Sequence, residues 1–201
     1  MHRALVILCF LLVSCAITRT MVNTMNATTP NLKSKEMIKA LDEHIVPLSE
    51  DISTVTEFPF LDSLFDSSQV VGLGESTHGT KEFYTLKANL ARYAIAHHSY
   101  RAVAIELPVG VGVYLNRYIR NEPNSSLQPY LGRFWIYNTE EVKQMIEWMR
   151  TYNRTAKAGM IQFYGIDPQN NEYALPLLKE FGTSIPSLAN EWSMPLQKLE
   201  S

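Results

Sequence analysis

Three short, mostly apolar runs limit the folds open to this chain more than any other feature of its sequence. They cover residues 69–73 (QVVGL), 101–107 (RAVAIEL) and 160–166 (MIQFYGI). Such runs are typical of strands that are buried on both faces of a sheet. Helices are expected between them, at residues 80–97 and near 110–120. Strands that alternate with helices predict right-handed crossovers and an α/β fold with a partial parallel sheet flanked by helices.

Further helices complete the expected domain, which covers residues 35–201 without an internal repeat or a second boundary. Residues 35–47 and 171–181 are expected to be helical. Asn138 is expected to cap a helix before the third strand, with Glu141 three residues later as in a capping box. The chain has 46% apolar and 19% charged residues and a net charge of -2. This composition is that of a globular domain and offers no basic surface for nucleic acid.

The first residues have the pattern of an export signal. A basic start (MHR) precedes an apolar stretch (ALVILCFLLV) that is too short to span a bilayer, which takes about 20 residues. Residues 1–15 are therefore interpreted as a signal peptide with a bacterial lipobox, and Cys15 as the lipidation site. Cleavage after Ala16 without lipidation is the alternative. Both interpretations predict export, the first as a membrane-anchored lipoprotein of the cell envelope in which residues 16–34 form a flexible tether.

Cysteine and metal chemistry are not expected in the domain. Cys9 and Cys15 are the only cysteines of the sequence, and both lie in the predicted leader. A mature chain would therefore have no disulfide, no thiol nucleophile and no cysteine-ligated zinc. Glu75 and His78 form a Glu-x-x-His pair, but di-iron bundles use that pair twice on long helices. No metal site and no cofactor are predicted.

Ionisable side chains follow each of the three predicted strands. Glu75 and His78 come after the first, Glu106 ends the second and Asp167 ends the third. Because parallel strands bring their carboxyl ends to one edge of the sheet, these groups are expected to gather at a common rim. The alternative is that each acid caps the next helix or faces solvent. Three acids near one imidazole favour a functional site.

The residues around His78 favour general-base chemistry over a serine nucleophile. A nucleophile elbow needs Gly-x-Ser-x-Gly, and His78 stands where the last glycine belongs. A dinucleotide-binding loop is not matched either, because Thr77 stands in place of its third glycine. As a base, His78 would take a proton from water while Glu75 or Glu106 fixes its tautomer. A helix cap or a core histidine is the alternative for His78.

Lys87 lies inside the predicted apolar face of its helix, which is expected to contain Phe83, Leu86, Leu90, Tyr93 and Ala94. A cation there must pair with an acid or extend along the surface to water. Lys87 is interpreted either as a charge partner of the acids, or a clamp on developing oxyanion charge, or as a rim lysine. Nearby aromatic residues either line a pocket or belong to the core: Tyr84, Tyr114, Phe134, Trp135 and Tyr137.

Four ordered blocks of sequence resemble the erythromycin esterase family. They are GLGESTHGTKEFYTLKANLARY, RAVAIELP, FWIYNTEEVKQMIEWMRTYN and IQFYGIDPQ, and they span about residues 69 to 170. The resemblance implies a hydrolase that opens a carboxylic ester or macrolide lactone with activated water, and that needs no metal. Such an activity is associated with antibiotic resistance. The implied partner is a small-molecule ester or lactone.

The resemblance also implies roles for individual residues. His78, Glu75 and Glu106 match positions that are essential in the family, and Lys87 matches a basic position that is often arginine. On the substrate side, the expected residues are Asp167 and Gln169.

The four blocks cover only the N-terminal half of the family's domain. An apparently truncated sheet is therefore expected, with the C-terminal half missing or encoded separately. Two alternatives to an active hydrolase stay open. One is a non-catalytic surface lipoprotein that holds haem or another ligand at the same rim, since the family fold is distantly akin to that of haem-binding surface lipoproteins. The other is an inactive truncated remnant.

Overall fold

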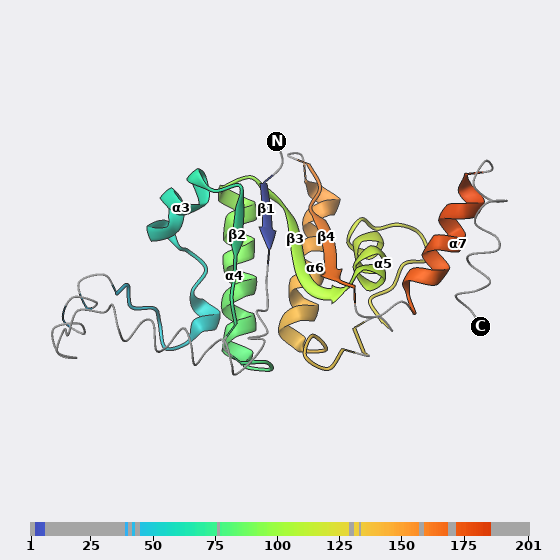
Figure 1. The fold of residues 1–201 in the computed structure, drawn as a ribbon. Coiled ribbons are helices and arrows are strands. Elements are labelled where there is room, and N and C mark those ends of the chain that lie inside the picture. Colours follow the sequence, from blue (N-terminus) through green and yellow to red (C-terminus); the bar gives the residue numbers. More distant parts are fainter. Residues whose placement is uncertain are drawn as a thin grey trace, which may run out of the picture.

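A four-stranded parallel sheet forms the centre of the computed structural model (Figure 1). Its strand order is β2-β1-β3-β4. The strands are β1 (Arg3–Val6), β2 (Val70–Gly72), β3 (Tyr100–Pro108) and β4 (Gln162–Asp167). The structure describes residues 3–6, 39, 42, 45–75, 77–128, 131–132, 134–156, 159–168 and 172–185. The prediction of an α/β fold with a small parallel sheet is confirmed.

β1 is the strand that the sequence analysis missed. It pairs in parallel with both neighbours, so that Leu5 is in register with Val71 on one side and Val103 on the other. The three strands predicted from the sequence are present as β2, β3 and β4, and β1 adds a fourth strand between β2 and β3. The apolar residues that were interpreted as a leader are equally suited to a buried strand. One folded molecule cannot both contain β1 and have lost residues 1–15.

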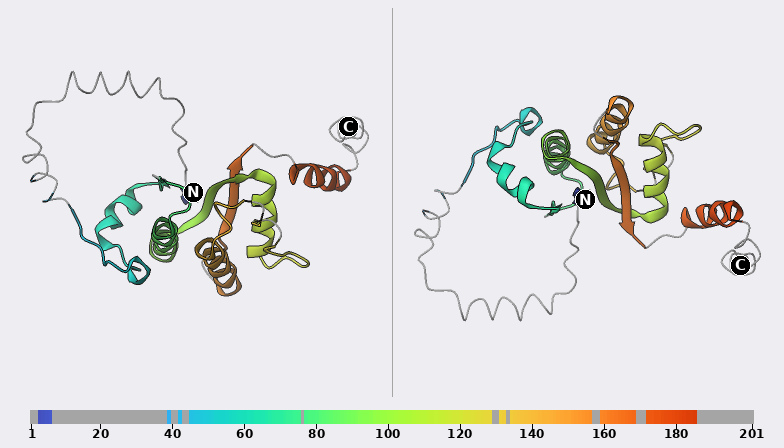
Figure 2. Two further views of the ribbon diagram at one scale, coloured as in Figure 1. Left: turned by 90° about the horizontal axis from the view of Figure 1, so that it is seen from below. Right: turned by 90° about the horizontal axis from the view of Figure 1, so that it is seen from above.

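Helices cover the sheet from both sides (Figure 2). α4 and α6 lie side by side, and α5 packs against β4. None of the helices in the described ranges is long and apolar enough to cross a membrane. Two short 3-10 helices, η1 (Ile52–Thr54) and η2 (Pro59–Leu61), precede the helices α3 (Asp62–Ser67), α4 (Lys81–His97), α5 (Val109–Ile119), α6 (Glu140–Thr155) and α7 (Ala174–Ser184).

The predicted helices are present, with differences at their ends. α6 begins after Thr139, whose hydroxyl accepts a hydrogen bond from the Val142 backbone at 3.3 Å, so Asn138 is not the cap. Thr139 has the extended backbone and side-chain oxygen of an N-cap, one residue later than expected. Of the helix expected at residues 35–47, residues 39, 42 and 45–47 are described; residues 39 and 42 are helical, whereas 45–47 are not. The buried face of α6 consists of Val142, Met145, Ile146 and Met149.

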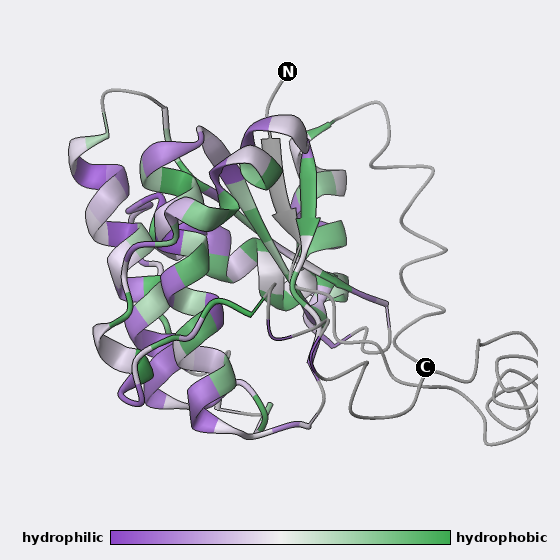
Figure 3. Ribbon diagram, turned by 90° about the vertical axis from the view of Figure 1, so that its left-hand side faces the viewer, coloured by the Kyte–Doolittle hydropathy of each residue, from purple (hydrophilic) through white to green (hydrophobic). Residues whose placement is uncertain are grey.

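The buried face of α4 is rotated relative to the predicted one. The helices of the domain carry both hydrophilic and hydrophobic residues around their circumference (Figure 3). Phe83, Leu86 and Leu90, which were expected to face the core, are only partly buried. The small residues Ala88 and Ala91 face the sheet in their place, because small side chains let a helix approach closely. Lys87 and Tyr84 belong to this inner face as well.

α5 approaches β4 more closely than side chains would allow. A β-carbon added to Gly112 would lie 2.0 Å from the backbone nitrogen of Gly165. A β-carbon on Gly165 would lie 2.5 Å from the Leu107 and Pro108 carbonyl oxygens. The glycines therefore set the distance between the helix and the strand.

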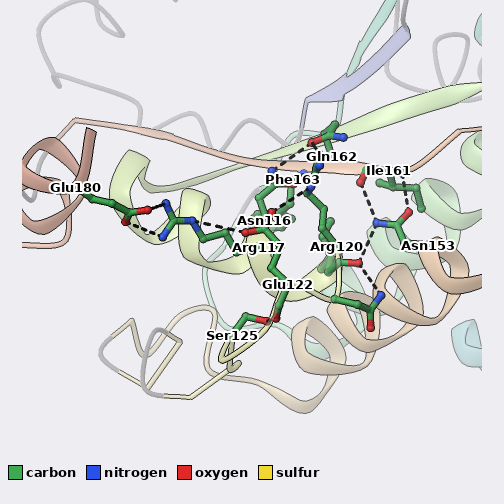
Figure 4. A network of polar contacts seen from close by, with 12 residues as sticks. Asn116, Arg117, Arg120, Glu122, Ser125, Asn153, Ile161, Gln162, Phe163 and Glu180 are labelled. Carbon is green, nitrogen blue, oxygen red and sulfur yellow. Dashed lines mark hydrogen bonds and ion pairs between the residues drawn. The ribbon is translucent and has the colours of Figure 1, made fainter. Parts of the chain in front are cut away.

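Two asparagines cover the outer edge of β4 (Figure 4). The Asn116 side-chain oxygen accepts a hydrogen bond from the Phe163 backbone at 2.9 Å, and that of Asn153 accepts one from the Ile161 backbone at 2.7 Å. The Asn153 amide also donates to the Ile161 carbonyl at 3.0 Å. The asparagine side chains thus form hydrogen bonds with backbone groups that a further strand would otherwise pair with. The edge of β4 is thus protected by α5 and α6.

A polar cluster joins α3 to the end of α4. Asp62 accepts hydrogen bonds from the Tyr93 hydroxyl at 2.6 Å and from the His98 ring at 3.0 Å. The second ring nitrogen of His98 lies 2.9 Å from Asp66. The hydrogen bond to Asp62 raises the pKa of Tyr93 to about 12. This cluster is part of the scaffold, at the opposite end of α4 from the loop that follows β2.

Candidate functional site

The loop between β2 and α4 carries the candidate catalytic groups. β2 ends at Gly72 and α4 begins at Lys81, so the chain turns within eight residues. Gly79 has a φ of +78°, a backbone conformation that favours glycine. The hydroxyls of Thr77 and Thr80 lie 2.7 Å apart and close the turn before the helix. This geometry brings the side chains of the loop back over the first turns of α4.

Glu75 is the centre of the site. One carboxylate oxygen lies 2.6 Å from Lys87 Nζ, and the other lies 3.1 Å from His78 Nδ1. The Glu75 side chain is 2% exposed and that of Lys87 is 8% exposed. A buried carboxylate requires a partner, and Lys87 provides the compensating charge. The interpretation of Lys87 as a charge partner therefore matches its position in the structure.

The contact with Glu75 sets the proton arrangement of His78. An ionised carboxylate can only accept a hydrogen bond, so Nδ1 must be the donor. In the neutral ring, the other nitrogen, Nε2, then has a free lone pair. The His78 side chain is 36% exposed, whereas its carboxylate partner is buried. The ring is therefore held at Nδ1 by a buried carboxylate while part of its surface is in contact with solvent.

A cavity of about 400 Å³ adjoins Glu75 and Lys87. Its other side chains come from Leu73 on the loop and from the partly buried residues of α4 that were expected in the core: Phe83, Leu86 and Leu90. The cavity is therefore apolar except for the ion pair. Apolar cavities with a few convergent polar groups are typical of small-molecule sites. A second cavity, of about 420 Å³, lies between α5 and α7 and is lined by none of the candidate residues.

Glu106 does not join this cluster. It lies on β3 and is partly exposed, and the structure shows no hydrogen bond or ion pair between it and the three clustered residues within the described ranges. Its neighbour Ile105 lines a small cavity together with Lys87. Glu106 itself does not line that cavity. Because β1 lies between β2 and β3, the distance from β3 to β2 is larger by one strand spacing, about 4.8 Å, than it would be for neighbouring strands.

The other predicted residues lie farther away or outside the described ranges. Asp167 ends β4, three strand positions from β2, which corresponds to about 14 Å. Gln169 and Cys15 lie outside the described residues. In the described ranges, no group of three or more His, Cys, Asp or Glu side chains is arranged to hold a metal ion. The structure thus brings together Glu75, His78 and Lys87 but not all four strand-end groups.

Sequence reasoning missed the cavity, and it named Trp135 only as one of several aromatic residues that either line a pocket or belong to the core. The cavity could not be predicted because the rotation of α4 decides which of its apolar residues stay uncovered. Trp135 lies next to Gly79 and is largely exposed. Tyr84 and Tyr137 are buried, with their rings 6.3 Å apart.

Comparisons with known proteins place this geometry in context. The family model described as erythromycin esterase matches residues 95–198. Erythromycin esterase type II from Escherichia coli is 32% identical over 149 residues, which are 72% of this chain and 34% of that protein. Erythromycin esterase type I from Escherichia coli is 28% identical over 115 residues, which are 57% of this chain and 27% of that protein. The chain thus spans about a third of the length of these relatives.

The fold is similar to that of a solved structure. A crystal structure of a succinoglycan biosynthesis protein matches with a TM-score of 0.72 and 28% identity. The match covers 85% of this chain and 44% of the other. The match to the family model begins after Glu75, His78 and Lys87, whereas Glu106 and Asp167 lie inside it.

Replacement of Lys87 by methionine tests the buried ion pair. Lys87→Met leaves the Glu75 charge in a buried position without its cation. We expect the free energy of unfolding to fall by about 3–5 kcal/mol, as when one partner of a buried pair is removed. Urea denaturation followed by circular dichroism measures the change.

The matched control is Lys143→Met, which removes a lysine from a pair with the largely exposed Glu140. We expect a change below about 1 kcal/mol there. Glu75→Gln in the Lys87→Met background should restore much of the loss, because the unpaired charge is gone. Equal losses for Lys87→Met and Lys143→Met would contradict the burial argument.

Proposed function

Because the chain belongs to the erythromycin esterase family, we propose that it is a hydrolase that cleaves a carboxylic ester or lactone with a water molecule activated by His78. The contact that carries this proposal is the 3.1 Å approach of His78 Nδ1 to Glu75. It leaves Nε2 as the free base of the ring. A chain that spans about a third of its relatives need not have their whole activity, so both the reaction and its substrate are part of the proposal.

In the proposed reaction, His78 Nε2 accepts a proton from water as the water oxygen attacks the carbonyl carbon. The imidazolium that forms is stabilised by the Glu75 carboxylate through Nδ1. The tetrahedral intermediate then collapses, the bond to the alcohol oxygen breaks, and His78 returns the proton to that oxygen. The products are a carboxylic acid and an alcohol, and the histidine returns to its neutral state. The reaction needs no covalent enzyme intermediate.

Lys87 supports this reaction from behind the carboxylate. Its ammonium lies 2.6 Å from Glu75 and is buried, so it compensates the Glu75 charge while the site is at rest. We assign it the role of holding Glu75 ionised and in place, rather than direct contact with the substrate. Lys87 matches the basic position of the family, which would then have the purpose of compensating the charge of the buried glutamate.

The cavity beside Glu75 favours substrates with an apolar, aliphatic part. Its volume of about 400 Å³ and its leucine and phenylalanine lining suit a macrolide lactone or a simpler ester with an aliphatic acyl group. Glu106, Asp167 and Gln169 are proposed to act on the substrate side of a complete domain. The remaining part of that domain, when it is encoded separately, is a proposed partner.

We also propose that the protein is exported and anchored to the membrane by lipid on Cys15, on the basis of the leader pattern. Mature protein of this kind lacks β1. When the chain is expressed in a bacterium that is supplied with a labelled lipid, the wild-type protein should carry the label and the Cys15→Ser variant should not. An intact mass that retains residues 1–15 without lipid would contradict the anchor and favour β1 as a permanent strand.

Replacement of the proposed base is the direct test of the reaction. His78→Ala should lower kcat/KM for a macrolide lactone and for p-nitrophenyl acetate by about 100-fold or more, since general-base catalysis contributes on this scale. His97→Ala is the control, because His97 is exposed at the far end of α4 and should leave the rate unchanged. Hydrolysis at the wild-type rate by His78→Ala would exclude His78 from the mechanism. A wild-type chain that hydrolyses neither compound would instead indicate a binding protein or an inactive remnant.

The two glutamates should differ in importance. Glu75→Gln removes the acceptor that orients His78, so we expect it to lower kcat by about 10-fold to 100-fold, a part of the contribution that general-base catalysis makes. Glu106 lies outside the cluster, so Glu106→Gln should have a smaller effect on kcat, and its main effect should be on KM. Steady-state kinetics of both variants on one ester distinguish these outcomes. Equal losses of kcat would show that Glu106 reaches His78 in solution.

A further inference from the structure

Trp135 is the most exposed large apolar side chain among the described residues, at 73%. An indole so exposed still has most of its apolar area in water, so a ligand that covered it would gain the free energy of that burial. Trp148, by comparison, packs against the Tyr152 ring with centroids 5.5 Å apart and lies beneath the Arg92 guanidinium. For Trp135 the described part of the chain shows no such aromatic or cation–π contact. Its indole face is therefore available to a ligand.

The segment that carries Trp135 is firmly attached to the core. Leu131 and Tyr137, on either side of it, are buried. The backbone turns back on itself twice, since Phe134 N–H donates to the Leu131 carbonyl at 3.0 Å and Tyr137 N–H donates to the Phe134 carbonyl at 2.9 Å. Trp135 is thus held outward between two anchored positions. A ring presented in this way loses little conformational entropy on binding.

Trp135 lies beside the loop of the proposed base. A β-carbon on Gly79 would lie 3.7 Å from the Cζ3 atom of the indole, and Gly79 directly follows His78. Two further contacts join the start of α4 to the residues that follow Trp135. The rings of Tyr84 and Tyr137 pack together, and Lys81 approaches Glu141 at 4.0 Å. The exposed indole therefore lies beside the loop that carries His78.

We propose that Trp135 is a substrate-positioning residue that stacks against the apolar face of a bulky ester or lactone and makes the site prefer such substrates over small esters. This inference rests on the proposed function, because it concerns the same site. Trp135 takes no part in proton transfer. Contact between the indole and an apolar face of the substrate removes apolar area of both from water, which favours binding. Loss of the indole is therefore expected to weaken the binding of a bulky substrate and to spare a small one.

The test compares two substrates on the full chain. Trp135→Ala should raise KM for erythromycin about 3-fold to 10-fold with little change in kcat, and leave KM for ethyl acetate, a small ester without an aromatic ring, unchanged. Trp135→Phe, which keeps an aromatic face, should recover most of the loss. Equal KM values for wild type and Trp135→Ala on erythromycin, or equal increases on both substrates, would overturn the proposal.

A binding measurement separates this inference from the hydrolase proposal. Equilibrium dialysis of labelled erythromycin with His78→Ala, and with His78→Ala/Trp135→Ala, reports affinity without turnover. A 3-fold to 10-fold weaker Kd in the double variant supports the role of Trp135 even if the wild-type chain hydrolyses nothing. Equal affinities, or no binding by either chain, contradict it. Near-ultraviolet circular dichroism of both variants verifies that the fold is intact.

Discussion

The candidate site depends on a single buried carboxylate that is shared between two partners. Glu75 uses one oxygen for Lys87 and the other for His78, and its side chain is almost fully removed from water. In a medium of low polarity, neither contact is independent of the other, since the charge that Lys87 compensates is the charge that orients the imidazole. The chemistry proposed for His78 and the stability of the β2-α4 connection therefore have the same origin.

The position of Glu75 depends in turn on β2, which is an edge strand of three residues. In the described part of the chain, β2 pairs with β1 alone. β1 is formed by Arg3–Val6, the segment whose composition also predicts a leader. If residues 1–15 are removed on export, another strand has to occupy this position for β2 to stay attached to the sheet. The fold of the site and the maturation of the chain are thus linked through the same four residues.

The sequence was sufficient for much of the fold because three of the four strands and the helices between them have strong apolar patterns. β1 was missed because a short apolar strand and the apolar part of a leader have the same composition. The association of Glu75, His78 and Lys87 followed from spacing on one loop and one helix, which local geometry determines. Glu106 was expected at the same point because parallel strands bring their carboxyl ends to one edge of the sheet, but β1 lies between β2 and β3 and separates Glu106 from the loop. The exposure of Trp135 depends on long-range packing, which no local pattern encodes.

The proton arrangement of the imidazole is the central claim of this account, and nitrogen NMR of histidine-labelled protein measures it directly. We expect His78 to show a protonated Nδ1 and an unprotonated Nε2 when the ring is neutral. In Glu75→Gln, the preference for this tautomer should weaken, because a neutral amide no longer requires a donor. A wild-type His78 with its proton on Nε2, or a tautomer that is unaffected by Glu75→Gln, would contradict the proposed role of the shared carboxylate.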